Sequence, residues 1–237
     1  ETAAFLEKKI TEFPAATSSP PNLYSQYLFS ELCFQLADTR QTLGASAKEV
    51  TDLYQKGLAG GWLAYSRQGP VLEWLYENLP AEQYEKTVFS LLANNNDCFR
   101  GVAGQAETLM QNQKMQEAIA FLEANLAAFA HWRQQFPLLA VDAEGALPAL
   151  YFQMAKAKES VDSSEDEIAS AYQQTFRPSP YDYTLQKCQA LSWLLAKERK
   201  EEYQKIVSSA AHEPPGENNP FREVVRHLCG NLEQAQD

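Results

Sequence analysis

The stretch KMQEAIAFLEANLAAFAHWRQQ, residues 114–135, predicts an α-helix more clearly than any other part of the chain. Alanine, glutamate, glutamine and leucine dominate it, and these residue types lose little conformational freedom in a helix. Its apolar side chains recur every three or four residues and so share one face: Met115, Ala118, Ile119, Leu122, Leu126 and Phe129. A helix with one apolar face is stable only when neighbours cover that face, so other parts of the chain must pack on it.

The same periodicity recurs along the chain, interrupted by residues that begin and end helices. Ser46 with Glu49, and Ser164 with Glu167, have the S-x-x-E spacing of a capping box. Gly44 is placed as the glycine that ends a helix. Three prolines are placed to open a helix, where a missing N–H does no harm: Pro70, Pro80 and Pro148. No run alternates strictly as a half-buried strand does, so the sequence predicts an all-α protein of about ten helices.

The connections between these helices are short, which makes consecutive helices antiparallel neighbours. We therefore expect an irregular multi-helix bundle or an array of antiparallel helix pairs. Residues 1–21 are interpreted as an N-terminal helix followed by a Pro/Ser-rich linker, and residues 22–237 as a single helical domain that ends in an amphipathic helix at 221–232. No copy of a tetratricopeptide-like repeat is visible, so a repeat architecture stays open by shape only.

The balance of charge restricts the possible partners. The chain has 31 acidic and 20 basic side chains and a formal net charge of −11. Such a surface repels nucleic-acid phosphates and anionic membrane faces, so we expect neither partner. It favours a basic protein partner, or it serves solubility alone. No apolar run reaches the about 20 residues of a membrane span.

The cysteines indicate a reducing compartment. Cys33, Cys98, Cys188 and Cys229 are widely separated, each within an apolar helical pattern, which is typical of free buried thiols rather than of a disulfide framework. The residues after Glu1 lack the layout of a signal peptide. We therefore expect a cytoplasmic protein. Because a starting Met is missing, whether native residues precede Glu1 stays open.

No motif for catalysis, cofactor binding or metal binding is present in the sequence. His131, His212 and His227 are isolated, and His227 and Cys229 are two residues apart on a predicted helix and so point to different faces. The patterns G-x-S-x-G, G-x-G-x-x-G, G-x-x-x-x-G-K-[ST] and E-x-x-H are all missing. Cys98 is close to a predicted helix start, where a thiolate would be stabilised, yet a structural role is the commoner one. We predict no catalytic residue, no cofactor and no metal.

Two sets of residues are candidates for partner binding. The first is an acidic patch that would recognise a basic partner: Asp162, Glu165, Asp166 and Glu167. The second is a set of aromatic side chains near predicted turns, at Gln68–Pro70 and after Pro180, where they would act as anchors: Trp62, Tyr65, Trp74, Tyr181 and Tyr183. Solvated charge and core packing are the competing and commoner explanations for the two sets.

The stretch TRQTLGASAKEV at residues 39–50, with Leu53-Tyr54 and Gly57-Leu58 after it, joins an apolar helix to a capped amphipathic one. It resembles the start of helical immunity proteins of bacterial polymorphic toxin systems, especially the PoNe-type nuclease immunity proteins, over residues 23–60. The resemblance implies an all-helical protein that blocks a cognate toxin by contact and performs no chemistry. It assigns no binding residue.

Three hypotheses follow from the sequence. The leading one is an immunity protein or similar inhibitor that neutralises a basic toxin through an acidic helical face with aromatic anchors. The second is a helical-repeat-like scaffold or adaptor that binds peptides or proteins in a groove. The third is an enzyme whose site has no recognisable motif. The oligomeric state stays open.

Overall fold

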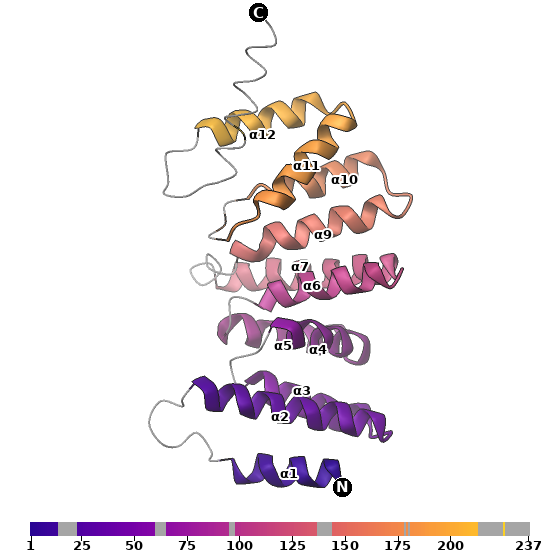
Figure 1. Ribbon diagram of the computed structural model, residues 1–237, viewed down its shortest axis with the longest axis vertical. Helices are drawn as coiled ribbons and strands as arrows, with labels where there is room; N and C mark the ends of the chain where they lie inside the picture. The colour runs from indigo at the N-terminus through magenta and orange to yellow at the C-terminus, as the bar shows by residue number, and fades with distance from the viewer. Residues whose placement is uncertain are drawn as a thin grey trace, which may run out of the picture. The chain divides into compact units, whose positions relative to one another are not determined.

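The computed structural model describes residues 1–13, 23–59, 65–94, 98–136, 144–177, 179, 181–212 and 225. Within these ranges the protein consists of eleven α-helices and one short 3₁₀ helix, without any strand (Figure 1). The predicted all-α fold class and the array of helices are confirmed. No helix in the described ranges is long and apolar enough to cross a bilayer.

Contacts between the helices group the chain into two compact units, which are described separately. Unit 1 comprises Glu1–Thr108 and Ala120–Ala143, and unit 2 comprises Leu109–Ile119 and Glu144–Asp237. Unit 1 contains α1 (Thr2–Glu12), α2 (Leu23–Thr42), α3 (Ala47–Ala59), α4 (Tyr65–Asn78), α5 (Ala81–Asn94) and most of α6 (Cys98–Gln111) and α7 (Met115–Gln135). Unit 2 contains η1 (Glu144–Ala146), α9 (Leu147–Glu159), α10 (Glu165–Gln174), α11 (Thr184–Ala196) and α12 (Lys200–His212).

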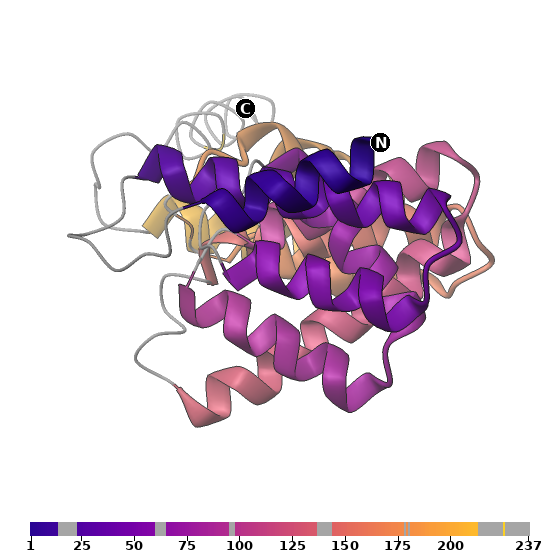
Figure 2. The same cartoon turned by 90° about the horizontal axis from the view of Figure 1, so that it is seen from below.

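Helix α1 belongs to unit 1, because its buried residues Leu6 and Ile10 pack against Cys33 and Leu36 of α2. Figure 2 shows α1 lying along α2. The sequence predicts one domain from residue 22 onward, whereas these contacts join α1 to α2 and divide the later residues between the two units.

The pair α2–α3 has the turn that the sequence predicts. Gly44 has φ +77°, and the backbone N–H of Ala45 donates to the carbonyl of Arg40 over 2.9 Å, which closes the end of α2. The hydroxyl of Ser46 accepts from the N–H of Glu49 over 3.3 Å, and the Glu49 carboxylate accepts from the N–H of Ser46 over 3.2 Å. The predicted capping box at the start of α3 is therefore confirmed.

Gly57 of α3 is closely packed against α2 in this pair. A Cβ on Gly57 would lie 2.5 Å from the ring of Phe34, and the hydroxyl of Ser30 donates to the Gly57 carbonyl over 2.7 Å. The neighbour that approaches is thus a buried aromatic ring of α2.

The predicted turn at Gln68–Pro70 is wrong, because α4 runs without interruption from Tyr65 and contains Pro70. Gln68 and Gly69 are buried, and Gly69 lies against the backbone of Gly101 in α6. Packing against α6 therefore keeps this segment helical, although Pro70 provides no N–H for the carbonyl four residues earlier. The helix start predicted at Pro80 is confirmed: the Pro80 carbonyl accepts from the N–H groups of Gln83 and Tyr84 in the first turn of α5.

The core of unit 1 is rich in aromatic rings. Phe99 of α6 and Phe129 of α7 meet edge to face, with ring centroids 5.3 Å apart, and Trp132 is fully buried beside Phe129. One buried amide is satisfied inside this core: Asn125 accepts from the Tyr84 hydroxyl over 2.9 Å and donates to the carbonyl of Phe121 over 2.8 Å. The helix predicted at residues 114–135 is confirmed as α7.

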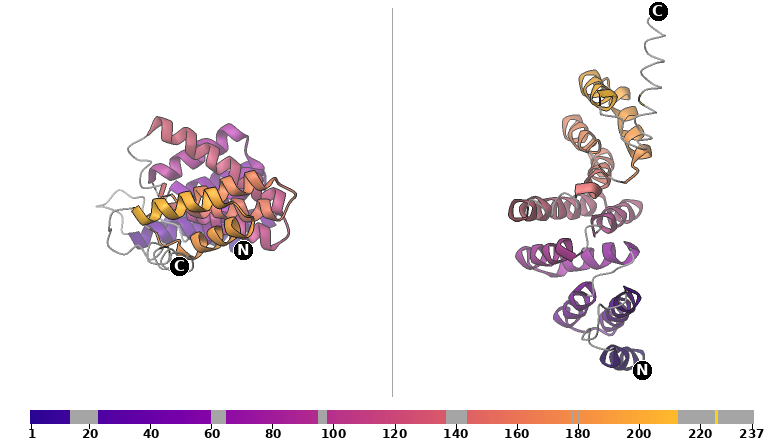
Figure 3. Two further views of the ribbon diagram at one scale, coloured as in Figure 1. Left: turned by 90° about the horizontal axis from the view of Figure 1, so that it is seen from above. Right: turned by 90° about the vertical axis from the view of Figure 1, so that its left-hand side faces the viewer.

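Unit 2 is built from two successive helix pairs, α9–α10 and α11–α12, which Figure 3 shows from two directions. Pro148 lies in the first turn of α9, as the sequence predicts. Leu191, Val207 and Val225 are buried together and join α11 to α12. Val225 is the one described residue of the predicted helix at 221–232; the rest of that helix and the predicted linker lie outside the described residues.

Candidate functional site

The predicted acidic cluster lies at the start of α10 in unit 2. The Ser164 hydroxyl accepts from the backbone N–H of Glu167 over 3.3 Å, and the Glu167 carboxylate accepts from the N–H of Ser164 over 3.1 Å. This confirms the second capping box. Hydrogen bonds from the Ser164 hydroxyl and backbone lower the pKa of Glu167 below its usual value. The carboxylate is therefore part of the helix cap.

Three of the four predicted carboxylates have basic partners within unit 2. Lys197 contacts Glu165 over 2.9 Å, and Lys158 lies 3.8 Å from Glu167. Arg199 pairs with Asp166, and this hydrogen bond raises the pKa of the Arg199 guanidinium above its usual value. The pairs of Lys197 and Arg199 join α10 to the turn between α11 and α12, and the pair of Lys158 joins α10 to α9. Together they neutralise much of the patch.

The fourth carboxylate differs in its surroundings. Asp162 is exposed in the turn between α9 and α10 and forms no ion pair with a described residue. An outside cation reaches Asp162 directly, whereas at the other three carboxylates it has to compete with a lysine or an arginine of unit 2.

Among the predicted aromatic anchors whose side chains the structure describes, Tyr183 is buried and Trp74 and Tyr181 are half-buried. Trp74 is half-buried and lies edge to face on Tyr54, with centroids 5.3 Å apart, and Tyr183 is 8% exposed beside the half-buried Tyr181. Trp62 lies outside the described residues, as does the side chain of Tyr65, the first residue of α4. Trp74 thus packs within unit 1, and Tyr181 and Tyr183 pack together within unit 2.

The surface of α11 stands out instead, because two of its leucines are exposed. Leu185 is 67% exposed and Leu195 is 56% exposed. The other exposed residues of this helix are Gln189, Ser192 and Ala196, so the exposed face has no charge. We call these five residues the α11 face. The helix has one charged residue, Lys187, in a chain in which 22% of residues are charged.

The residues at the two ends of the α11 face are polar and charged. Asp182 is exposed, and hydrogen bonds from the Thr184 side chain and from its backbone N–H, the latter over 2.9 Å, lower the pKa of Asp182. Beyond the other end of the helix, two exposed cations alternate with two exposed anions: Lys197, Glu198, Lys200 and Glu201. An apolar stripe with a polar rim is the usual composition of a protein-binding surface.

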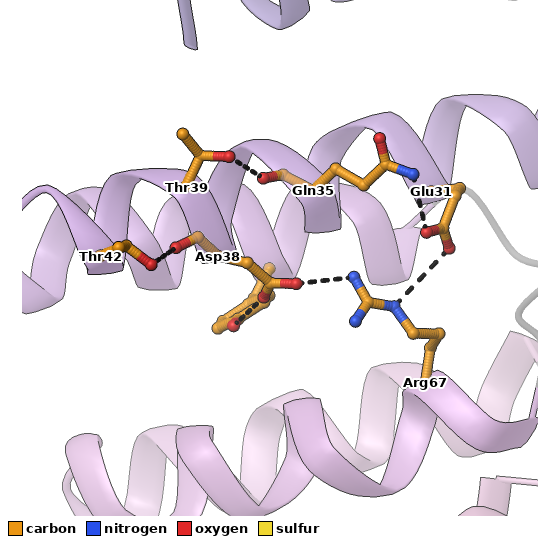
Figure 4. Close-up of polar contacts among 7 residues, drawn as sticks. Glu31, Gln35, Asp38, Thr39, Thr42 and Arg67 are labelled. Atoms are coloured by element: carbon orange, nitrogen blue, oxygen red, sulfur yellow. Dashed lines mark hydrogen bonds and ion pairs between the residues drawn. The ribbon is translucent and has the colours of Figure 1, made fainter. Parts of the chain in front are cut away.

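A second polar cluster, in unit 1, joins α2, α3 and α4 (Figure 4). Arg67 donates to Asp38 over 2.8 Å and lies 3.7 Å from Glu31, and the Tyr54 hydroxyl donates to Asp38 over 2.7 Å. Burial, followed by the hydrogen bond to Asp38, raises the pKa of Tyr54 above its usual value. Because these groups bind one another, the cluster connects three helices and has a structural role.

A cavity of about 320 Å³ opens between α3 and α5 of unit 1. Its walls are formed mainly by amide, hydroxyl and aliphatic side chains: Gln55, Leu58, Ala59, Gln83, Lys86, Thr87, Ser90 and Leu91. The Gln55 amide donates to the Thr87 hydroxyl over 3.1 Å, and Lys86 is bound by Glu82 over 2.7 Å. The Gln55–Thr87 bond belongs to the contact between α3 and α5, and the Lys86–Glu82 pair lies within α5.

His131 of α7 is exposed and takes part in a short hydrogen-bonded chain within unit 1. Its Nδ1 lies 2.8 Å from Glu85, its Nε2 lies 2.9 Å from the Gln135 amide, and its ring packs on Phe89. Both ring nitrogens therefore have protein partners, and the chain joins α5 to α7.

No protein-family model, curated protein or solved structure matches this chain. The resemblance of residues 23–60 to helical immunity proteins therefore rests on their sequence pattern alone.

Proposed function

We propose that this protein is a protein-binding module that acts by direct contact with a basic partner, as an inhibitor does. The observation that carries the proposal is the uncharged, exposed α11 face with two leucines more than half exposed. Exposing apolar side chains to water is unfavourable by about 25 cal/mol per Å². A partner that covers Leu185 and Leu195 recovers that free energy on binding.

The net charge of −11 supports a basic partner. Charge of one sign speeds the encounter with a protein of the opposite sign and disfavours acidic competitors. A toxin that acts on nucleic acid needs a basic surface to bind phosphates, so it would be attracted to this acidic chain. The resemblance over residues 23–60 implies a nuclease toxin as the target. We propose an immunity protein as the particular form of the inhibitor.

A scaffold that binds several proteins is the second candidate. The successive helix pairs α2–α3, α9–α10 and α11–α12 favour it, because stacked helix pairs are the building units of adaptor proteins. The two candidates differ in what they bind: an inhibitor has one cognate target whose activity it blocks, and a scaffold has several targets that stay active.

Site-specific photocrosslinking in the source cells tests the proposal. A benzophenone amino acid replaces Gln189 in the α11 face, and in a matched control it replaces Gln41, an exposed glutamine of α2 in unit 1. We expect crosslinks from position 189 to one basic protein, which after purification binds the chain in a 1:1 complex and loses its activity.

Crosslinks to several unrelated proteins that remain active would support the scaffold. The absence of a protein crosslink from position 189, from position 41 and from further exposed positions scanned over both units would end the proposal of a protein-binding function.

A further inference from the structure

We infer that the first turn of α4, residues 65–69, is a conformational switch that opens away from α6 while the rest of unit 1 stays folded. In the closed arrangement the Gln68 side chain is buried against α6, and in the open arrangement water reaches it. This inference is independent of the proposed protein-binding function, because it concerns a contact inside unit 1.

Gln68 makes the closed arrangement unfavourable. It is 0% exposed, and neither its Oε1 nor its Nε2 has a hydrogen-bond partner among the described residues. A side-chain amide has one acceptor oxygen and two N–H donors, all of which bind water when a glutamine is exposed. Burial of these groups without partners therefore favours any arrangement in which they are hydrated.

The backbone of α6 lies directly against this amide. Gly101 has no side chain, and a Cβ there would lie 2.8 Å from the Cβ of Gln68 and 3.2 Å from its Oε1. Gly69, the next residue of α4, lies against the Gly101 carbonyl in the same contact. Because the two backbones are this close, water reaches the Gln68 amide only when α4 and α6 separate here.

The first turn is weakly tied to the rest of α4. Pro70 provides no N–H for the carbonyl four residues earlier, so one hydrogen bond between the first turn and the second is missing. Gly69 adds the conformational freedom of a residue without a Cβ. After Pro70 the helix is firmly packed, because Val71, Leu72 and Leu75 are at most 3% exposed. The part that opens therefore ends at Gly69 and Pro70.

Arg67 opposes the opening. Its guanidinium donates to Asp38 over 2.8 Å and lies 3.7 Å from Glu31, and both acids belong to α2 (Figure 4). These ion pairs hold the turn in the closed arrangement, whereas the unpaired amide of Gln68 favours the open one. A ligand that binds one of the two arrangements more tightly than the other shifts the equilibrium between them.

Amide hydrogen exchange of the full chain, followed by NMR, tests the inference. The N–H groups of Gly69 and Val71 report on the first turn, because in an α-helix they donate to the carbonyls of residues 65 and 67. The N–H of Leu75 reports on the part of α4 that stays folded. Urea separates the two kinds of opening: a local opening exposes little surface and responds weakly to urea, whereas global unfolding responds strongly.

The variant is Gln68→Met, which removes the unpaired amide and keeps a long, unbranched side chain. The matched control is Gln105→Met in α6. Gln105 is also buried at the contact between α4 and α6, but its amide donates to the Glu73 carboxylate. The two substitutions therefore differ in whether the amide that they remove has a partner.

In the wild type we expect Gly69 and Val71 to exchange faster than Leu75, at rates that low concentrations of urea leave unchanged. Gln68→Met should slow exchange at Gly69 and Val71 by about 5- to 150-fold, because the closed arrangement then contains no unpaired amide. Gln105→Met should accelerate it, because this substitution removes a hydrogen bond that the closed arrangement contains.

Exchange at Gly69 and Val71 as slow as at Leu75, with the same response to urea, would overturn the inference, because the turn would then open only with global unfolding. So would exchange that Gln68→Met leaves unchanged or accelerates, since the amide would then have a partner, such as a buried water, in the closed arrangement. Neither result bears on the proposed function, which the crosslinks from position 189 test separately.

Discussion

Gly69 of α4 and Gly101 of α6 meet at the contact of their helices: a Cβ on Gly69 would lie 2.5 Å from the carbonyl oxygen of Gly101. A Cβ does not approach a carbonyl oxygen that closely, so the two backbones would have to move apart to admit a methyl group. The same helix α6 contains Gly104, which is exposed and has no atom within 4 Å of its Cβ position.

These two environments predict opposite effects of alanine. Gly69→Ala should reduce the free energy of unfolding by about 1–3 kcal/mol through overpacking. Gly104→Ala should raise it by about 0.4–1 kcal/mol, because alanine restricts the unfolded chain and fits the helix. Urea denaturation of both variants measures the difference. Equal effects of the two substitutions would show that α4 and α6 do not touch at the glycines.

Removing the cap of α10 should weaken unit 2 in a pH-dependent way. Ser164→Ala should lower the free energy of unfolding by about 0.5–2 kcal/mol, as loss of an N-cap hydroxyl does. The folded-state pKa of Glu167 is lowered by Ser164, so the stabilisation by this carboxylate is present above its unfolded value of about 4.3 and is lost as pH falls through the folded value.

The destabilisation by Ser164→Ala should therefore shrink below about pH 4. Thermal unfolding of the variant and the wild type across the acid range measures this, with Ser170→Ala at an exposed position of the same helix as a control. A destabilisation that stays constant down to pH 2 would contradict the reciprocal bond between Ser164 and Glu167.

Tyr54 should resist ionisation at alkaline pH. Its burial and its bond to Asp38 raise its pKa above the usual value of about 10, so its contribution to stability is present below about pH 10 and is lost as pH rises through the folded value. Tyr54→Phe should lower the free energy of unfolding at neutral pH by about 1.5–3 kcal/mol, the range for a hydrogen bond to a charged group.

The phenolate absorbance band of the wild type and of Tyr54→Phe, followed during alkaline titration, measures the ionisation. The difference between the two proteins should appear only as the fold is lost. A phenol that ionises near pH 10 in the folded wild type would refute the contact with Asp38.

Cys33 should be unreactive in the folded protein. Its side chain is fully buried, and this burial raises the pKa of its thiol to about 11. Because the thiolate is the reacting form, iodoacetamide at neutral pH should modify Cys33 only after unfolding. Mass spectrometry of peptides after timed labelling measures the rate, with the half-buried Cys188 as the internal comparison. Labelling of Cys33 as fast as that of Cys188 would contradict the packing of α1 on α2.

The sequence predicts the helices and their caps well because these depend on local residues. Gly44, Ser46 and Ser164 act on backbone groups within a few positions of themselves, so their roles are visible in the chain order. The turn predicted at Pro70 is wrong for a non-local reason: contact with Gly101, far along the sequence, keeps α4 helical. Such tertiary contacts are not visible in the local pattern.

The candidate site is less visible in the sequence for the same reason. Periodicity predicts that Leu185 and Leu195 are apolar helix residues, but which sides of α11 are covered depends on how the neighbouring helices pack. Likewise, composition identifies Glu165 and Asp166 as acidic, and only the structure pairs them with Lys197 and Arg199. One sequence feature does single out α11: it has a single charged residue, Lys187, in a chain in which 22% of residues are charged.

The central claim is that this protein acts by binding a protein partner through its α11 face. Hydrogen–deuterium exchange tests this claim most directly. The measurement compares two samples: the free chain, and the chain in complex with the basic protein that the benzophenone at position 189 crosslinks. We predict slower exchange in Thr184–Ala196 on binding, and unchanged exchange in α2. Unchanged exchange in Thr184–Ala196, with protection elsewhere or nowhere, would contradict the account.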